Sequence, residues 1–381
     1  MLRILHTVEF YHPHIGGAEI VVQRLSEGMV RKGHQVTVAT TKLPERRSLE
    51  LNGVQIKEFD VQGSLATGFK GDDISQYISF VSGAPYDVML NYAAQQWATD
   101  LAFPSLAEPL ERINIIVPCG YSALTNDLLL RGPEYAVYFN KLLPPVLQRY
   151  DAAVYHSAAY KDFKFALYHK LKNSVIIPNG IDESEFSSPP AINFREKYGI
   201  SGGHLLLCVA NFLEDKGHER VVRAFRRLKR NDCTLVMIGS KNTPILERIR
   251  QECEGLNTRI LVDIPRQDTV AALLSSDLFV FASHIEVFPL VIVEAMAAGL
   301  PFVSTDCGNV REMKGGVVCE PEQMHLNIQS LLDDEPARRD LGAKGRQECL
   351  SRYTWGKVVD QYEALYFSLL DYRKRGHAAM R

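Results

Sequence analysis

Residues 283–308 read SHIEVFPLVIVEAMAAGLPFVSTDCG, and they say more about the fold than any other part of the chain. A short apolar run precedes them, and the stretch itself predicts a loop, a helix and a second strand. Pro289 stands in the predicted first turn, where its missing N–H needs no partner, and Gly299 ends the helix. The N–H groups of Leu290 and Val291 then lie unpaired at the positive end of the helix dipole. They predict a binding site for a diphosphate.

Two carboxylates flank the predicted anion site. Glu286 lies on the loop before the helix, and Glu294 lies about a turn and a half inside it. We expect one of these carboxylates to contact sugar hydroxyls and the other to contact a ribose. The spacing alone is weak evidence, because two glutamates eight positions apart occur four times in the chain. The order of strand, loop, proline, helix, glycine and strand is what favours a functional site.

The rest of the chain alternates short apolar runs with helical patterns. Examples of such runs are residues 3–8, 87–91, 204–210 and 278–282. They are apolar on both faces, as expected of strands in a sheet that helices cover on both sides. A Pro- and Ser-rich stretch at residues 182–193 interrupts the alternation and has the composition of a linker. The sequence therefore predicts an α/β fold with two Rossmann-like domains facing a cleft.

The composition argues against several classes of protein. The chain has 381 residues, more than one hydrophobic core usually organises, and its formal net charge of −2 gives no global attraction to nucleic acid. The seven cysteines stand singly, without the spacing of a disulfide framework or a zinc site. No apolar run approaches the ~20 residues of a membrane span. We expect a cytoplasmic protein, and the oligomeric state stays open.

Local basic runs leave two interpretations open. They occur at residues 226–230 (RRLKR) and 373–375 (RKR). Such runs are usually solvated helix faces. The alternative is peripheral contact with anionic headgroups at the inner face of a membrane, or with a phosphorylated acceptor.

Four further stretches, together with residues 283–308, resemble a known family. They are Gly16-Gly17-Ala18-Glu19, residues 177–182 (IPNGID), residues 209–217 (VANFLEDKG) and Tyr353-Thr354-Trp355. In order and spacing they resemble the glycine-rich loop, the interdomain stretch, the phosphate-binding loop and the start of the terminal helix in the family-4 retaining glycosyltransferases (group 1). The resemblance covers the whole chain. It implies the GT-B fold, with an N-terminal acceptor domain at residues 1–180, a donor domain at 181–353 and a helix at 354–381 that crosses back to the first domain.

The resemblance also implies roles for individual residues. Glu286 would contact the donor sugar, and Lys216 would neutralise the diphosphate leaving group together with two helix amides. These two residues are the expected catalytic pair. The expected donor-binding residues are Glu294, Asn211, Gly16, Gly17, Phe288, Leu290 and Val291.

The chain departs from the family pattern at two positions. Asn211 stands where the family commonly has an arginine, so a bidentate charged clamp on phosphate is lost there. Cys119 stands where the family often has a histidine that positions the sugar. His6, His12 or His14 could take over that role, with His12 and His14 on a loop beside the predicted cleft, or the activity could be weakened.

The predicted function is transfer of a sugar, with retention, from a UDP- or GDP-type sugar to a glycan, glycolipid or other hydroxyl acceptor in glycoconjugate biosynthesis. There is no D-x-D motif and no cluster at metal-ligand spacing, so we expect neither a metal ion nor another cofactor. Two alternatives stay open: a sugar-nucleotide epimerase on the same fold, and a non-catalytic partner protein. A nicotinamide oxidoreductase is disfavoured, because Gly16-Gly17 is not G-x-G-x-x-G and no acidic residue ends the second strand.

Overall fold

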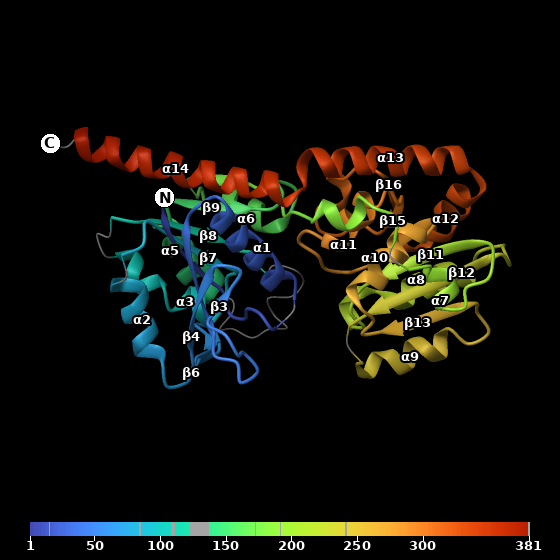
Figure 1. The fold of residues 1–381 in the computed structure, drawn as a ribbon, viewed down its shortest axis with the longest axis horizontal. Coiled ribbons are helices and arrows are strands. Elements are labelled where there is room, and N and C mark those ends of the chain that lie inside the picture. The colour runs from blue at the N-terminus through green and yellow to red at the C-terminus, as the bar shows by residue number, and fades with distance from the viewer. Residues whose placement is uncertain are drawn as a thin grey trace. The chain divides into compact units, whose positions relative to one another are not determined.

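The computed structural model describes residues 1–14, 16–83, 85–107, 111–121, 137–171, 173–190, 192–240 and 242–379, with side chains as far as residue 375. The chain forms two compact units (Figure 1). Unit 1 comprises Met1–Asn179 and Trp355–Arg381, and unit 2 comprises Gly180–Thr354. Within the described ranges, none of the helices combines the length and the apolar character needed to cross a lipid bilayer.

Unit 1 is built around an eight-stranded sheet with the order β10-β9-β8-β7-β1-β2-β4-β3. Neighbouring strands run parallel, except for the antiparallel pair of β3 and β4. The strands are β1 (Arg3–Thr7), β2 (Gln35–Thr41), β3 (Glu50–Leu51), β4 (Val54–Phe59), β7 (Val88–Tyr92), β8 (Ile113–Val117), β9 (Ala152–Tyr155) and β10 (Ser174–Ile176), and a separate antiparallel pair is formed by β5 (Gln62–Ser64) and β6 (Gly68–Lys70). Every residue of β7 and β8 is buried. Burial on both faces explains why these strands read as nearly continuous apolar runs.

Helices cover the sheet of unit 1. They are α1 (Gly17–Arg31), α2 (Ile74–Gly83), α3 (Trp97–Asp100), η1 (Phe103–Ala107), η3 (Tyr138–Leu142), α5 (Leu143–Leu147), α6 (Lys161–Tyr168) and α14 (Trp355–Ala379). In α1 the buried residues Val21, Val22, Leu25 and Met29 recur at helical spacing, so one face of the helix packs on the sheet and the other meets water.

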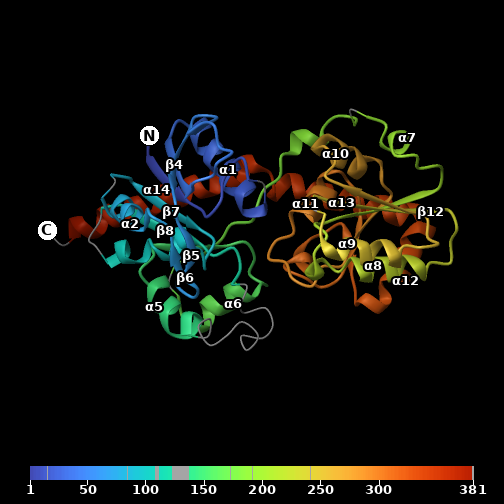
Figure 2. The ribbon, with the colours of Figure 1, turned by 90° about the horizontal axis from the view of Figure 1, so that it is seen from below.

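Unit 2 has a six-stranded, wholly parallel sheet with the order β13-β12-β11-β14-β15-β16. Its strands are β11 (His204–Val209), β12 (Cys233–Gly239), β13 (Thr258–Val262), β14 (Leu278–Phe281), β15 (Phe302–Ser304) and β16 (Gly316–Val318). Its helices are η4 (Glu183–Phe186), α7 (Phe194–Lys197), η5 (Glu214–Lys216), α8 (His218–Arg226), α9 (Pro244–Glu252), α10 (Arg266–Ser275), α11 (Leu290–Ala297), η6 (Val310–Glu312), η7 (Pro321–Gln323), α12 (Met324–Asp333) and α13 (Glu335–Arg352). Figure 2 shows these helices around the sheet from a second direction.

The two faces of this sheet build two separate cores. Alternate residues of a strand point to opposite faces, so Leu205 and Leu207 of β11 join one core while Leu206 and Cys208 join the other. Helices α10 and α11 supply the first core, and α8, α9 and α12 supply the second. The sheet is therefore a doubly wound α/β layer, which brings the loops after its strands to one edge.

The terminal helix α14 packs on unit 1, beside α1 and β8 (Figure 1). Lys32 donates to Glu363 at 2.7 Å, and Arg373 bonds to Asp151 at 2.9 Å. The helix thus returns to the first sheet after unit 2 is complete, as the sequence predicts.

Three local features differ from the predictions. Residues 182–193 do not form a free linker, because Phe186 is buried in the core of unit 2. Helix α11 begins at Leu290, so Pro289 caps the helix instead of occupying its first turn. Residues 135–148 have a helical pattern that predicts one continuous helix; the structure has η3 followed by α5 there, and residues 135 and 136 lie outside the described part of the chain.

Candidate active site

The loops after β11 and β14 are joined in unit 2. The Ser283 hydroxyl and the His284 amide both donate to the carbonyl of Asp215, at 3.0 and 2.8 Å. Gly217 has φ +63°, and a Cβ there would lie 2.1 Å from the carbonyl oxygen of Ala282. A glycine is required because the backbone both adopts a left-handed conformation and passes against the neighbouring loop. The two loops therefore hold their side chains in a fixed relation.

Lys216 and Glu286 meet where these loops join. Lys216 Nζ lies 2.9 Å from Glu286 Oε1 and 3.5 Å from Asp215 Oδ2. Burial acts to lower the pKa of Lys216, but the carboxylates of Glu286 and Asp215 outweigh it and the pKa is raised. The lysine is thus protonated, and two carboxylates compensate its charge.

Helix α11 begins four residues after Glu286. The Ile292 amide donates to the Pro289 carbonyl at 3.1 Å, whereas no carbonyl of the helix lies three or four residues before Leu290 or Val291 to accept from their amides. Phe288 is buried, and its ring packs edge-on against Tyr353 at 5.6 Å between centroids. The Phe288 side chain thus belongs to the core of unit 2, and its backbone is the part that could reach a donor.

Glu294 forms an ion pair within unit 2. Arg266, the first residue of α10, lies 2.7 Å from Glu294 Oε1 and 2.6 Å from a carboxylate oxygen of Glu185. Burial raises the pKa of Glu294, and Arg266 opposes that shift. One carboxylate oxygen of Glu294 is therefore engaged by Arg266, which also orients the side chain.

Asn211 forms hydrogen bonds with the loop after β12. Its Oδ1 accepts from the amide of Ser240 at 3.2 Å and also from the Ser240 hydroxyl. With its oxygen so engaged, the amide group of Asn211 ties the loops after β11 and β12 together.

The carboxylate of Glu19 packs against the glycine-rich loop of unit 1. Gly17 is the first residue of α1, and Gly16 precedes it with extended backbone. A Cβ on Gly16 would lie 2.3 Å from Glu19 Oε2, so the Glu19 side chain fills the space beside the glycine. His14 Nδ1 lies 3.4 Å from the other Glu19 oxygen, and His12 is exposed.

Cys119 follows β8 in a conformation that is uncommon outside glycine. Its φ is +56°, a region that non-glycine residues enter mainly in turns and at functional sites. Burial raises the pKa of Cys119 to about 11, against a hydrogen bond with Tyr92 that lowers it. The thiol is therefore uncharged at neutral pH, and it cannot supply the positive charge of a protonated histidine.

A buried histidine, His156, shares a neighbour with Cys119, because both side chains contact Tyr92. His156 follows β9, and its Nε2 lies 3.4 Å from the Tyr92 hydroxyl. Burial lowers the pKa of His156 to about 4, so the ring is neutral at pH 7. The sequence predictions did not include His156, although its place at the carboxyl end of a parallel strand was a usable signal.

His6 belongs to the core of unit 1. The ring is fully buried, Nδ1 lies 2.8 Å from the Ser26 hydroxyl, and Nε2 lies 3.3 Å from the Tyr366 hydroxyl of α14. Burial lowers the pKa of His6 to about 3. His6 therefore does not take over the role of a sugar-positioning histidine. Its role is structural, because its ring connects α1 and α14 to β1.

Two charged residues at the unit 2 site were not predicted. Asp215 lies in the stretch 209–217 directly before Lys216, whereas Arg266 belongs to no motif and only the fold brings it to Glu294. Across the described ranges there is no group of three or more His, Cys, Asp or Glu side chains placed to hold a metal ion.

Two family models together span most of the chain. The model described as "Glycosyl transferases group 1" matches residues 191–348, and the model described as "Glycosyltransferase Family 4" matches residues 15–185. The first match contains the joined loops of unit 2, and the second contains the glycine loop and Cys119.

Among curated proteins, N-acetyl-alpha-D-glucosaminyl L-malate synthase of Bacillus anthracis is 27% identical over 96% of this chain and 97% of its own length. One component of the human phosphatidylinositol N-acetylglucosaminyltransferase is 25% identical over 94% of this chain and 74% of its own length.

Solved structures share the fold across nearly the whole chain. Sucrose-phosphate synthase from Thermosynechococcus elongatus has a TM-score of 0.78 at 18% identity and covers 97% of this chain and 100% of its own. HepE from Anabaena, solved in complex with UDP and glucose, has a TM-score of 0.75 at 18% identity with the same coverage. Sequence, fold and family matches agree: the chain is a group 1, family 4-like glycosyltransferase with the GT-B fold.

Proposed function

We propose that this glycosyltransferase takes a UDP- or GDP-type sugar as donor, binds its diphosphate in unit 2 and transfers the sugar with retention to a hydroxyl acceptor. The observation that carries the proposal is the pair of Lys216 and Glu286 on joined loops, close in sequence to the start of α11. A lysine and free helix amides suit a diphosphate, and a carboxylate suits sugar hydroxyls.

The proposed chemistry exchanges one ion pair for another. When the donor binds, its diphosphate takes the place of Glu286 as the main partner of Lys216, which leaves Glu286 to accept from the sugar. The bond between the anomeric carbon and the diphosphate oxygen breaks, and the acceptor oxygen bonds to the same face of that carbon. The acceptor proton passes to the leaving diphosphate. Lys216 and the amides of Leu290 and Val291 stabilise the negative charge that develops there.

Glu294 fits the ribose role in this proposal. Arg266 holds one of its carboxylate oxygens, so the other can accept hydrogen bonds from two neighbouring ribose hydroxyls. Because the lysine and amides carry the charge compensation, the mechanism includes no metal ion or other cofactor.

Names of relatives guide the choice of substrates. Two relatives that cover more than nine-tenths of the chain are named for N-acetylglucosaminyl transfer, one to L-malate and one to phosphatidylinositol. HepE was solved with UDP, and a half-length match is named for GDP-mannose. We therefore place UDP-N-acetylglucosamine first among donors and a small hydroxy acid, a glycan or a lipid-linked hydroxyl among acceptors.

We also propose peripheral contact with a membrane through α6. On this helix Leu167 is 61% exposed and Tyr168 is 81% exposed, with Lys161 and Lys164 exposed on the same short helix. Exposed apolar side chains beside lysines suit the interface of an anionic bilayer. A lipid-linked acceptor would be reached there.

The test is release of nucleoside diphosphate from a panel of UDP- and GDP-sugars, with and without candidate acceptors. A new glycoside whose anomeric configuration matches the donor, by NMR, is the expected result. The Lys216→Ala variant serves as the control for the assigned site. Conversion of the sugar without an acceptor would instead identify an epimerase, and an inverted product would overturn the retaining mechanism.

A further inference from the structure

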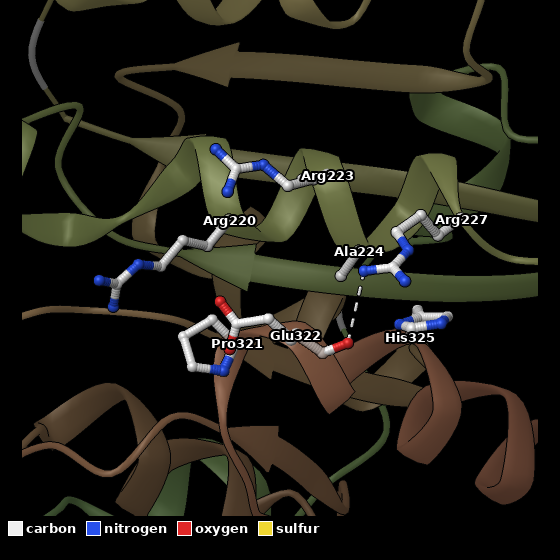
Figure 3. A pocket seen from close by; sticks show the side chains of 7 residues that line it. All are labelled: Arg220, Arg223, Ala224, Arg227, Pro321, Glu322 and His325. Atoms are coloured by element: carbon white, nitrogen blue, oxygen red, sulfur yellow. Dashed lines mark hydrogen bonds between the residues drawn. The ribbon is translucent and has the colours of Figure 1, made fainter.

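A hollow lies between α8 and the segment that joins β16 to α12. Arg220, Arg223, Ala224 and Arg227 line it from α8 or just beyond, Pro321 and Glu322 from η7, and His325 from α12. Figure 3 shows the guanidinium groups of Arg220 and Arg223 turned to one end of this hollow, and Arg227 and His325 at the other end. We call these seven residues the arginine pocket.

The arginines of this pocket differ from their neighbours in sequence. Arg226 donates to the carbonyl of Glu252, and Arg230 forms ion pairs with Asp232 and Asp333. By contrast, Arg220 and Arg223 form no ion pair with any carboxylate in the described part of the chain. Arg220 and Arg223 precede the basic run at residues 226–230, and in the described part of the chain they lack the protein partners that Arg226 and Arg230 of that run have.

Helix geometry explains how the pocket forms. Val221, Val222 and Phe225 face the core of unit 2, where Met324 and Ile328 of α12 pack with them. Arg220, Arg223 and Arg227 lie at spacings of three and four residues, on a common side of α8 that flanks this contact. Arg227 bonds to the carbonyl of Glu322 at 3.5 Å and closes the pocket on one side.

Retaining several like charges on one helix side has an energetic penalty. Like charges three or four positions apart on a helix repel each other and destabilise it slightly. No acidic partner offsets this at Arg220 or Arg223 within the described ranges. A bound anion would offset it.

We propose that the arginine pocket binds the phosphate group of a small phosphorylated ligand. Guanidinium groups form two parallel hydrogen bonds to phosphate, and Arg220 and Arg223 lie within one turn of each other on α8. Glu322 is the one carboxylate among the lining residues, so it opposes anion binding and limits the charge that the pocket accepts. None of the seven residues belongs to the proposed donor site, so this site is independent of it.

The direct experiment is calorimetric titration of the full chain with inorganic phosphate, pyrophosphate and a hexose phosphate at low ionic strength. Arg220→Gln together with Arg223→Gln should weaken binding at least about tenfold, because each change removes charged hydrogen bonds. Glu322→Gln should tighten binding. Arg339→Ala, which removes an 80% exposed arginine of α13 paired with Glu335, should leave it unchanged.

Two further measurements make the result specific. Lys216→Ala removes the donor-site lysine, so phosphate binding that survives this change and disappears with the double arginine variant is assigned to the arginine pocket. Without phosphate the double variant should melt at the wild-type temperature or slightly above, since like charges are removed. Equal binding in wild type and double variant, or binding lost only with Lys216→Ala, would overturn the proposal.

A vesicle assay separates the two sources of phosphate. Sedimentation with vesicles of phosphatidylcholine containing a phosphoinositide, competed by free hexose phosphate, tells a lipid headgroup from a free metabolite. Binding of either source that depends on Arg220 and Arg223 supports the pocket. Absence of arginine-dependent binding to every probe contradicts it.

Discussion

The carboxyl ends of the two sheets carry opposite chemistry. In unit 2, Lys216, Glu286, Arg266 and Glu294 are charged and paired across neighbouring loops. In unit 1, burial leaves His156 and Cys119 uncharged at neutral pH. The two units share a parallel α/β architecture, so this difference comes from the loops and not from the fold.

The difference suggests a division of labour between the units. Paired charges can be exchanged for the charges of a diphosphate with little net desolvation, whereas neutral buried groups offer hydrogen bonds to hydroxyls without attracting anions. The substitutions below alter charged or hydrogen-bonding groups in unit 1 or in unit 2, and a final test removes metal ions.

The largest effect is expected for Lys216→Ala. The variant removes the side chain that we assign to the leaving diphosphate, a contribution of about 3–4 kcal/mol in comparable cases. Turnover should fall by about two to three orders of magnitude. Lys344→Ala is the matched control, because this lysine is exposed and pairs with Asp340 four residues earlier on the same helix. A nearly silent Lys216→Ala variant would show that the charge pair of unit 2 serves the loops alone.

Glu286→Gln should separate binding from turnover. The amide cannot compensate Lys216, so bare UDP should bind as well as before or more tightly. Turnover should fall by about tenfold to a hundredfold, the value of one hydrogen bond to a charged group. Titration with UDP and steady-state rates measure the two effects, and Glu247→Gln, an exposed change on α9, is the control. Weaker UDP binding would mean that the carboxylate positions Lys216 for the diphosphate.

The pH dependence of stability tests whether burial keeps an acidic group of unit 1, Asp100, uncharged. Burial raises the pKa of Asp100 to about 7 from 3.8, although the Leu65 amide and the Tyr138 hydroxyl donate to it. The folded state thus binds a proton that the unfolded state releases, so this contribution is complete below about pH 4 and is lost as the pH rises through 7. Between pH 7 and pH 5 wild type should gain about 2 kcal/mol from this group, a gain that Asp100→Asn should lack. Denaturant unfolding at both pH values measures the difference, and identical pH slopes would contradict it.

A smaller gain is expected from Asn211→Arg. The change adds a second cation near Lys216 and should tighten UDP binding a few-fold, since a charged hydrogen bond replaces a neutral one. Loss of the bonds to Ser240 acts in the opposite direction. Ser240→Ala measures that loss alone, and an arginine variant that binds UDP no better than Ser240→Ala would contradict the expectation.

No effect at all is expected from a chelator. If lysine and helix amides carry the charge compensation in unit 2, turnover should be the same with and without excess EDTA. A rate that falls with EDTA and returns with Mn²⁺ would assign part of that compensation to a metal ion.

The fold was more predictable than the contacts of the site. Strands such as β7, β8 and β11 are buried on both faces, and such burial leaves a continuous apolar run in the sequence. Short elements, such as the four-residue helix α3, are too short to show a helical repeat of apolar residues in the sequence.

The site could be predicted only where its residues lie close together in the sequence. The loop with Glu286 and the start of α11 are neighbours in sequence, and proline and glycine mark them. Asp215 is also local, since it precedes Lys216 within η5, but Arg266 comes from α10 and no local pattern predicts its pairing with Glu294. His6 shows the reverse case: an isolated histidine looks functional in sequence, and only α14, some 360 residues later, reveals it as part of the core.

The return of α14 to unit 1 has a consequence for biosynthesis. Residues that bury His6 and pair with Lys32 are translated after the whole of unit 2. The emerging chain can therefore complete unit 2 while the first unit still exposes the groove that Tyr362 and Tyr366 fill. We expect the later-translated unit to mature first on the ribosome, reversing the usual order, with chaperones engaging the open groove until the helix arrives.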